Sequence, residues 1–474
     1  MIYAWAKKKD TPYVKDTVFC NNFMSDFKKL LPSNFSGISI DDIDISEVIN
    51  FQENEKNVTQ DEKKRIAAER KKIKEKLKEK FGYAEVDGNK TEIANWMVEP
   101  PGIFIGRGSH PLRGRWKPNI RPEDVTLNLS KDATHPSGNW KKIIHEKDFM
   151  WVASWKEKLT NKTKHVWLSD SANLRQKRDK QKYDKALGLE DKIDDVRKYI
   201  TGSMKSEDEK IRKIATVCYI IDKLVMRVGD EKNEDEADTV GASTLRVEHV
   251  KFNPKSIEFD FLGKDSVKWQ KSIQISEADT SFVNNMKEFT KNKSKEELIF
   301  DGINSRVINN FFDKAVKSLT AKVFRTFHAT KKLAEYLNDA NMKRGSPDDV
   351  KLYQAKLGNL EVAVLCNHKK TPPKNWEESF KKKEEKLKKW MNQKPKTEKQ
   401  KMKLKERIEK LKLNMDITKK TKEYNLNTSL RNYIDPRVFK IWADKVGLDW
   451  EKIYNASLQK KFAWANSSRS KQKS

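Results

Sequence analysis

One tyrosine near the end of the chain lies where the sequence fixes the backbone. Tyr433 precedes Asp435 by two residues, and Asp435 is followed by Pro436. Aspartate is a favoured N-cap and proline is favoured at the first helical position, so a helix is predicted to begin here. A tyrosine held just before that helix suits a positioned nucleophile. It equally suits a hydroxyl that only ties down the helix entry.

Two cations farther upstream contrast with the residues around them. Arg227 falls in the largely apolar stretch 211–228, and a buried arginine needs a carboxylate or a bound phosphate as partner. Lys264 lies between two runs of alternating apolar residues, which predicts the tip of a β-hairpin. A structural ion pair for Arg227 and a merely exposed tip for Lys264 are the open alternatives to contacts with nucleic acid.

Two further residues lie on a predicted helix and at a predicted helix end. Thr320 can cap a helix that runs through Lys322 and Arg325. His368 follows an apolar run and precedes basic residues and prolines, which places it at the end of a helix. A histidine alone at such a place is more often structural than catalytic.

Together these five residues have the chemistry to break a phosphodiester without a metal. The reaction needs a nucleophile, cations on the non-bridging oxygens of the transition state, and an acid for the leaving oxygen. Tyrosine can supply the first, two arginines and a histidine the second, and lysine the third. Spacing alone does not show that the five converge.

Composition limits the classes of partner. The 474 residues carry a formal net charge of +29, which favours a polyanion, and nucleic acid first. The chain has no run of 18 apolar residues, and its start does not resemble a signal peptide. The three cysteines, Cys20, Cys218 and Cys366, are few and far apart, which favours a reducing compartment and argues against structural zinc. Neither a metal nor a cofactor is expected.

Periodicity divides the chain into segments of different character. A helix over 61–81 is predicted to dock by a narrow stripe of Ile66, Ile73, Leu77 and Phe81. The other segments follow in chain order: a small helical unit over 1–58, strands and loops over 83–170, helices over 173–240, period-two strands over 244–275, helices over 305–366, a basic antiparallel helical hairpin over 374–425, and the tyrosine segment over 426–474.

A glycine-rich stretch over 99–111 could be mistaken for a dinucleotide-binding fingerprint. No helix is predicted to follow it, and Pro111 stops any helical turn. Arg107, between two glycines, could lie on a close-approach loop and enter a nucleic-acid groove, although an ordinary surface turn suits the spacing better.

Ordered sequence blocks along nearly the whole chain resemble the eukaryotic type IB DNA topoisomerases. The blocks are 99–111, 122–124, Asp238-Thr239-Val240-Gly241, 245–249, Phe259-Asp260-Phe261-Leu262-Gly263-Lys264-Asp265-Ser266, 319–326 (LTAKVFRT), 365–368 with 372–374, 432–437, and Lys461-Phe462-Ala463-Trp464-Ala465.

The resemblance implies a role for each of the five residues. Tyr433 would be the nucleophile that forms a 3′-phosphotyrosyl link. Arg227, Arg325 and His368 would stabilise the transition state, and Lys264 would be the general acid. Residues at positions that touch DNA or line the cleavage site would be Arg107, Lys164, Lys232, Thr239, Asp265, Asn309, Lys322, Asn367, Thr428 and Asn432. Arg107, Asp265 and Asn432 also match positions that contact camptothecin-like poisons.

The implied fold is a multidomain α+β, C-shaped DNA clamp. Its catalytic subdomain would be mainly helical and related to tyrosine recombinases. The expected divisions are a partial lid subdomain over 1–58, a lid subdomain with strands over 59–170, the catalytic subdomain over 171–373, a coiled-coil linker over 374–425, and a small helical C-terminal domain over 426–474.

Three departures from the family pattern carry expectations of their own. The chain begins well inside the family's lid, so clamp closure, processivity and nuclear import are expected to differ. Ile105 stands where the family commonly has arginine, so one DNA contact is expected to be lost. The linker is short, which could speed strand rotation or religation.

The expected function is ATP-independent relaxation of supercoiled double-stranded DNA by a monomer, with roles in replication and transcription. The resemblance implies the nucleus, and an organelle or a virus is the open alternative. A tyrosine recombinase would share the five residues. It usually carries histidine three residues before the second arginine, where this chain has Lys322. A decayed, non-enzymatic clamp is a third alternative, but it would have no reason to retain all five residues.

Overall fold

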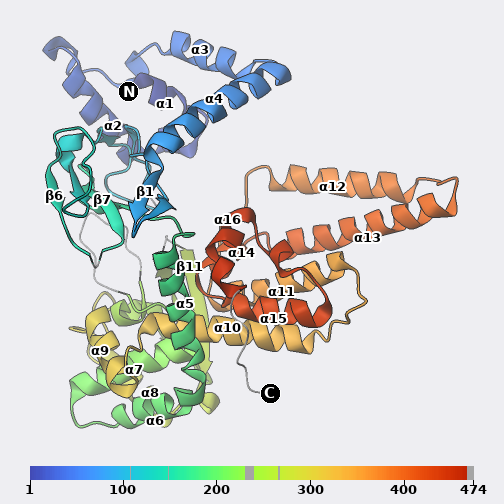
Figure 1. Cartoon of the computed structure of the whole chain (residues 1–474). Helices are drawn as coiled ribbons and strands as arrows, with labels where there is room; N and C mark the ends of the chain where they lie inside the picture. The colour runs from blue at the N-terminus through green and yellow to red at the C-terminus, as the bar shows by residue number, and fades with distance from the viewer. Residues whose placement is uncertain (107, 148, 230–239, 265–266, 467–474) are drawn as a thin grey trace. The chain divides into compact units, whose positions relative to one another are not determined.

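The computed structural model describes residues 1–106, 108–147, 149–229, 240–264 and 267–466 (Figure 1). Within this part of the chain, residues 1–177 form one compact unit and the residues from 178 onward form a second. Each unit has its own hydrophobic cores.

The first unit begins with short helices around a small aromatic core. The helices are α1 (Ile2–Ala6), α2 (Thr17–Phe27), α3 (Ser46–Lys56) and the long α4 (Gln60–Phe81). Trp5, Phe19 and Phe23 are buried together, and Ile105 packs against this core. Ile105, where the resemblance implied an arginine, is therefore a packing residue in this chain.

The long helix α4 corrects one prediction. Its capping box at Thr59 and its end before Gly82 follow the sequence signals. No residue of α4 is buried, however, and Ile73, Leu77 and Phe81 are 59%, 40% and 49% exposed. The predicted docking stripe was wrong, because the charged residues that dominate α4 let it stand in water without a covered face.

Short strands follow α4, as the sequence predicts for 83–170. β1 (Tyr83–Val86) pairs with β2 (Asn89–Glu92), and β3 (Gly102–Ile103) with β4 (Trp116–Lys117). A four-stranded sheet has the order β6-β5-β7-β8, with β6 parallel to β5 and the other pairs antiparallel. Its strands are β5 (Val125–Asn128), β6 (Lys142–Ile144), β7 (Trp151–Lys156) and β8 (Thr163–Trp167).

The second unit contains the largest core, formed by helices against an antiparallel sheet of order β11-β10-β9. α5 (Asn173–Leu187) leads into it. The helices are α6 (Ile193–Ser203), α7 (Glu209–Leu224), α8 (Thr280–Thr290) and α9 (Ser305–Ala315), and the strands are β9 (Val250–Phe252), β10 (Ser256–Gly263) and β11 (Val267–Gln274). Gly263 pairs with Val267, so Lys264 stands at a hairpin tip, as predicted.

One helix joins this core to a second one. The N-terminal half of α10 (Ala321–Asp339) packs Phe324 and Phe327 into the large core. Its C-terminal half packs Leu333 and Leu337 into the second core. That core is completed by α11 (Asp348–Leu365), α14 (Leu426–Asn432), α15 (Pro436–Val446) and α16 (Ala456–Lys461), and Figure 1 shows these helices gathered around α10. Arg325 therefore lies where the two cores meet.

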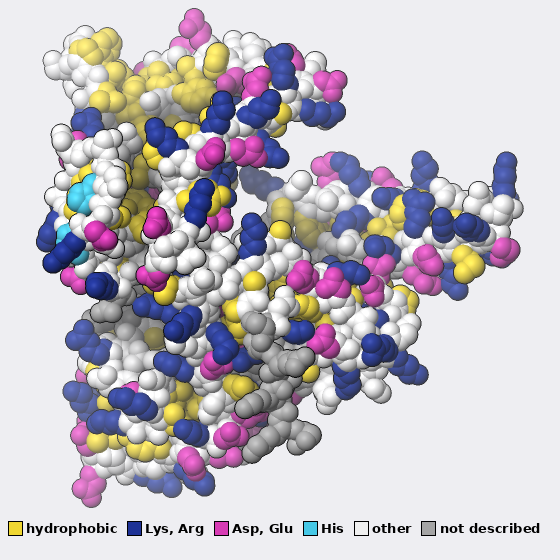
Figure 2. Space-filling view, in the orientation of Figure 1, with side chains coloured by type: hydrophobic (Ala, Val, Ile, Leu, Met, Phe, Trp, Pro, Cys, Tyr) yellow, Lys and Arg dark blue, Asp and Glu magenta, His cyan; other side chains and the backbone are white. Residues whose placement is uncertain are grey.

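Between α11 and α14 the chain forms the predicted helical hairpin. α12 (Trp376–Met391) and α13 (Glu398–Lys420) run antiparallel (Figure 1), and Lys383 of α12 bonds Asn414 of α13 at 2.9 Å. Only Ile417 of the two helices is buried. In Figure 2 lysine and arginine side chains are scattered over the hairpin, among acidic and hydrophobic ones.

Two boundaries in the second unit differ from the predictions. The helix expected to continue past Val225 ends at Leu224, because Val225 adopts a left-handed conformation with φ 54°. Of the alternating pair, Leu245 is extended and follows one short 3-10 turn, Val247 begins another, and the first strand begins only at Val250. Alternation over so few residues also fits a turn with one buried side.

The architecture is a helix-rich α+β fold, which confirms the α+β part of the prediction. No helix in the described ranges is long and apolar enough to cross a membrane.

Candidate active site

Four of the five predicted residues meet in the second unit, and we call Arg227, Arg325, His368 and Tyr433 the Tyr433 cluster. The guanidinium carbon of Arg325 lies 5.0 Å from the centroid of the Tyr433 ring. The ring centroids of His368 and Tyr433 are 5.2 Å apart. The positive charge of Arg227 acts on Tyr433 and helps to lower its pKa.

Left-handed turns aim Arg227 and His368 at this point. α7 ends at Leu224, just before Val225, and α11 ends at Leu365, two residues before Asn367, which has φ 53°. Positive φ is strained for a β-branched residue such as Val225 and must be held by its surroundings. Arg325 supplies part of this hold, because it donates to the carbonyl oxygen of Val225 and, at 3.1 Å, to that of Cys366.

A glycine contact fixes the chain just after Arg227. The Arg227 carbonyl accepts a hydrogen bond from the Ala242 amide at 2.8 Å. Gly229 has φ 86°, and a Cβ built there would lie 2.8 Å from the Cα of Gly241. The two backbone segments approach so closely that both positions require glycine.

Tyr433 is fixed through its backbone. Its amide donates to the Ser429 carbonyl at 3.0 Å. The Thr330 hydroxyl, on α10, donates to the Tyr433 carbonyl at 3.3 Å and accepts from the Asp435 amide at 3.2 Å. Asp435 caps α15 by accepting from the Arg437 amide at 2.9 Å, which confirms the predicted helix start.

The segment after the hairpin docks beside His368. The Asn425 amide donates to the His368 carbonyl at 2.7 Å, and Lys369 forms a bridge with Tyr424. His368 Nδ1 lies 3.3 Å from the Ser429 hydroxyl. Its Nε2 is buried and meets no described hydrogen-bond partner, so it is the ring nitrogen left for a ligand.

Burial and the charges of the two arginines shift the pKa values of the cluster. Burial acts to raise the pKa of Tyr433, but the charges of Arg325 and Arg227 outweigh it and the pKa is lowered. Burial, with the same two charges, lowers the pKa of His368 to about 3, so its imidazole is neutral near pH 7. Burial, and then the charge of Arg325, lowers the pKa of Arg227.

This arrangement can bind and attack a phosphate. Two guanidinium groups and a neutral imidazole N–H can donate to non-bridging oxygens, while an acidified tyrosine supplies a nucleophilic oxygen. A carboxylate or a bound phosphate was the expected partner of Arg227. Among the described residues no carboxylate forms an ion pair with it, which leaves the phosphate alternative open.

Lys264 does not join this cluster in the described contacts. It is exposed at the β10–β11 tip. The convergence of all five predicted residues is therefore seen for four.

Of the predicted DNA contacts, six lie in the described ranges. Lys322 and Asn432 are exposed, and Lys164 is partly exposed in β8. Asn309 accepts from the Ala321 amide, and Asn367 donates to the Lys268 carbonyl at 3.1 Å. The backbone carbonyl of Thr428 accepts a hydrogen bond from the side-chain amide of Asn432. Arg107, Lys232, Thr239 and Asp265 lie outside the described residues.

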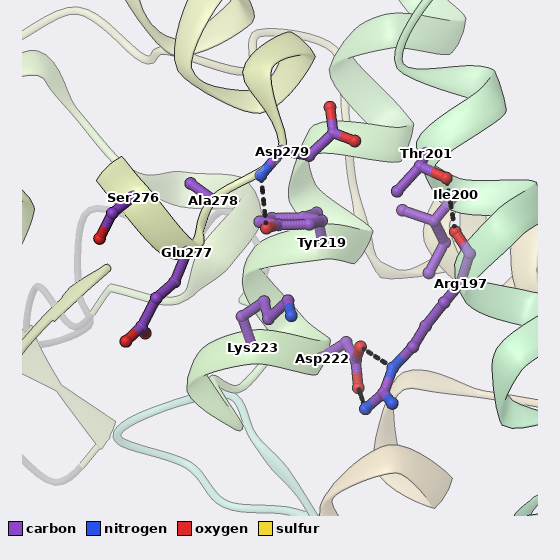
Figure 3. A pocket seen from close by; sticks show the side chains of 10 residues that line it. All are labelled: Arg197, Ile200, Thr201, Tyr219, Asp222, Lys223, Ser276, Glu277, Ala278 and Asp279. Atoms are coloured by element: carbon purple, nitrogen blue, oxygen red, sulfur yellow. Dashed lines mark hydrogen bonds and ion pairs between the residues drawn. The ribbon is translucent and has the colours of Figure 1, made fainter. Parts of the chain in front are cut away.

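Sequence reasoning missed several residues around the cluster. Thr330 and Ser429 give no signal, since their contacts join distant segments. Asp222, on the buried face of α7, accepts from His328 at 2.7 Å and from Arg197 at 2.8 Å, the latter drawn in Figure 3 beside a cavity of about 330 Å³. His328 stands three residues after Arg325, so this network helps to hold α10 in place.

Lys271, on an inward position of β11, was also missed.

The described residues contain no group of His, Cys, Asp and Glu arranged to hold a metal.

Comparison with known proteins identifies the family. Family models match residues 171–425 ("Eukaryotic DNA topoisomerase I, catalytic core"), 1–168 ("Eukaryotic DNA topoisomerase I, DNA binding fragment") and 405–473 ("C-terminal topoisomerase domain"). The chain is 34% identical to DNA topoisomerase 1 of Homo sapiens over 97% of its length and 65% of that protein. It is 35% identical to DNA topoisomerase 1 beta of Arabidopsis thaliana, again over 97% of the chain but 54% of that protein.

The chain thus spans less than two thirds of the length of these relatives. The match does not favour a tyrosine recombinase. Because of its sequence identity to these relatives and its match to the family models, this chain belongs to the eukaryotic DNA topoisomerase I family.

Proposed function

We propose that this chain relaxes supercoiled double-stranded DNA by cutting and resealing one strand through Tyr433. The observation that carries the proposal is a tyrosine of lowered pKa packed against two arginines and a histidine whose Nε2 has no described partner. The names of the relatives support the same activity.

In the proposed reaction the Tyr433 oxygen attacks a backbone phosphorus. A bond between this oxygen and phosphorus forms, and the bond between phosphorus and the 5′ oxygen breaks. The tyrosine proton passes to water, and Lys264 gives a proton to the leaving 5′ oxygen. After the free end rotates, the 5′ hydroxyl attacks the phosphotyrosine and restores both groups, so no ATP is needed.

The other cluster residues act on the phosphate oxygens. Arg227 and Arg325 hold the extra negative charge of the transition state. His368 contributes as a neutral donor from Nε2. Its Nδ1 must then accept from the Ser429 hydroxyl, which would give up its 3.4 Å hydrogen bond to the Leu426 carbonyl. Since each guanidinium has five N–H donors, Arg325 can bind two carbonyls and still face the phosphate.

The remaining expectations are part of the proposal. The predicted contacts Arg107, Lys164, Lys232, Thr239, Asp265, Asn309, Lys322, Asn367, Thr428 and Asn432 would bind DNA. A monomer would close as a clamp divided at residues 58, 170, 373 and 425, with the helical hairpin as linker, and would act in the nucleus. The net charge of +29 supports a polyanionic substrate.

Tyr433→Phe tests the proposal directly. The variant removes one oxygen and should bind plasmid DNA with unchanged affinity but fail to relax it, in an assay with excess EDTA and no ATP. Tyr199→Phe, at a tyrosine 38% exposed on α6, is the matched control and should relax plasmid at the wild-type rate.

Full relaxation by Tyr433→Phe would rule out Tyr433 as the nucleophile. Sequence-specific strand exchange between two duplexes by the wild type would instead favour the recombinase alternative.

A further inference from the structure

A lysine occupies a place in β11 that the strand pattern reserves for an apolar residue. The residues of β11 that face the core alternate, and Lys271 falls between Trp269 and Ile273, which are both buried. It stands opposite the fully buried Phe259 in β10. Lysine at such a position is rare unless the charge serves a purpose.

Its ammonium group binds the ends of two helices. Lys271 Nζ donates to the carbonyl oxygen of Leu224 at 3.1 Å and to that of Leu365 at 2.6 Å. These are the last residues of α7 and α11. Unpaired carbonyls at a helix C-terminus carry partial negative charge, so a cation there is favourable.

Arg325 binds the next carbonyl at each of the same two ends. It donates to Val225, which follows Leu224, and to Cys366, which follows Leu365. Lys271 and Arg325 together therefore hold two successive carbonyls at the end of α7 and two at the end of α11. The left-handed turns that lead to Arg227 and His368 begin at these ends.

Burial of this charge is costly, which argues against a purely structural role. No described carboxylate pairs with Lys271, and its pKa is lowered to about 8, chiefly by burial. Cys366 and Arg325 are the titratable groups that act on it, the first raising and the second lowering the pKa. A methionine of similar length would fill the same space in the strand without that cost.

We propose that Lys271 is a positioning residue that ties the end of α7 to the end of α11 and so sets the spacing of Arg227 and His368 on either side of Tyr433. The inference rests on the proposed strand cleavage at Tyr433. It assigns Lys271 no contact with DNA or with the reacting atoms.

Lys271→Met tests this role, because it keeps the length and apolar stem but removes the donors. Lys251→Met, at an exposed lysine in β9 of the same sheet, is the matched control. Three quantities are measured for each full-length variant: thermal unfolding, affinity for a duplex oligonucleotide, and the single-turnover rate of cleavage of that duplex.

Lys271→Met should stay folded and bind the duplex within about twofold of wild type, while cleavage slows at least about tenfold. In a His368→Ala background, the factor by which Lys271→Met slows cleavage should be at least about threefold smaller than in the wild type. The reason is that His368, one of the residues that Lys271 positions, is then already lost. A merely structural lysine would give the same loss in both backgrounds.

Wild-type cleavage rates in folded Lys271→Met, or equal losses in both backgrounds, would overturn the inference. If Lys271→Met does not fold, Lys271→Gln, which keeps a donor without the charge, takes its place in the same cycle. If the wild type itself forms no covalent complex with the duplex, the proposed function fails, and this inference fails with it.

Discussion

Polar contacts differ in kind between two parts of the second unit, the surroundings of Tyr433 and the helical hairpin. Around Tyr433, side chains bind buried backbone: Arg325 and Lys271 hold the ends of α7 and α11, and Thr330 holds the chain on either side of residue 434. In the hairpin of α12 and α13, polar contacts join side chains that water also reaches, as between Lys383 and Asn414.

The difference lies in what remains when a contact is removed. A buried carbonyl that loses its donor has no water to replace it, whereas an exposed side chain is rehydrated. Contacts around the Tyr433 cluster should therefore be sensitive to single substitutions, and contacts in the hairpin should be tolerant. The same asymmetry suits a site that must hold four side chains in one geometry.

Arg325→Met should have the largest effect and tests this contrast most directly. It leaves the carbonyls of Val225 and Cys366 without their donor and removes a cation beside Tyr433. Urea unfolding should show a loss of about 3 kcal/mol in the free energy of unfolding. Single-turnover cleavage should slow by about 100-fold or more.

The control for this variant is Arg306→Met, at an exposed arginine on α9. It should change neither quantity appreciably. Unchanged stability in Arg325→Met would contradict the view that this arginine holds the two helix ends.

Features set by local chemistry could be predicted from the sequence. Asp435 and Pro436 specify the helix after Tyr433 without help from the rest of the fold, and Gly447 ends it in the left-handed conformation that glycine favours. The β10–β11 tip followed in the same way from alternation on both sides of Lys264.

Features imposed by distant contacts could not be predicted. Nothing local to Val225 indicates a left-handed turn, since β-branched residues avoid it. The turn exists because Arg325, 100 residues away, and Lys271 bind the carbonyls at that helix end. The prediction for α4 failed for the opposite reason. The apolar periodicity of the helix is real, but no described element covers the apolar stripe.

His368→Gln gives a smaller, pH-dependent effect. Burial, with the charges of Arg325 and Arg227, lowers the pKa of His368 to about 3 from 6.5. Between these values the unfolded chain binds a proton that the folded chain does not. The stability of the wild type is therefore full above 6.5 and is lost as the pH falls toward 3.

Glutamine does not titrate, so the variant lacks this loss. Lowering the pH from about 7.5 to about 5 should destabilise the wild type by about 2 kcal/mol more than His368→Gln, measured by urea unfolding at each pH. Parallel pH profiles of the two proteins would show that His368 is not held neutral in the folded state.

Arg407→Met in the hairpin should have the smallest effect. The guanidinium carbon of Arg407 lies 4.4 Å from the centroid of the Trp390 ring, which joins α13 to α12. Arg407 is exposed, so the interaction should contribute about 0.5 to 1 kcal/mol. Urea unfolding should show a loss no larger than that, and single-turnover cleavage should match the wild type.

Lys405→Met, two residues away on the exposed surface of α13, controls for the loss of one positive charge. A loss in Arg407→Met that approached the effect of Arg325→Met would break the contrast. It would mean that the hairpin, despite its single buried residue Ile417, depends on its polar contacts as strongly as the cluster it leads back to.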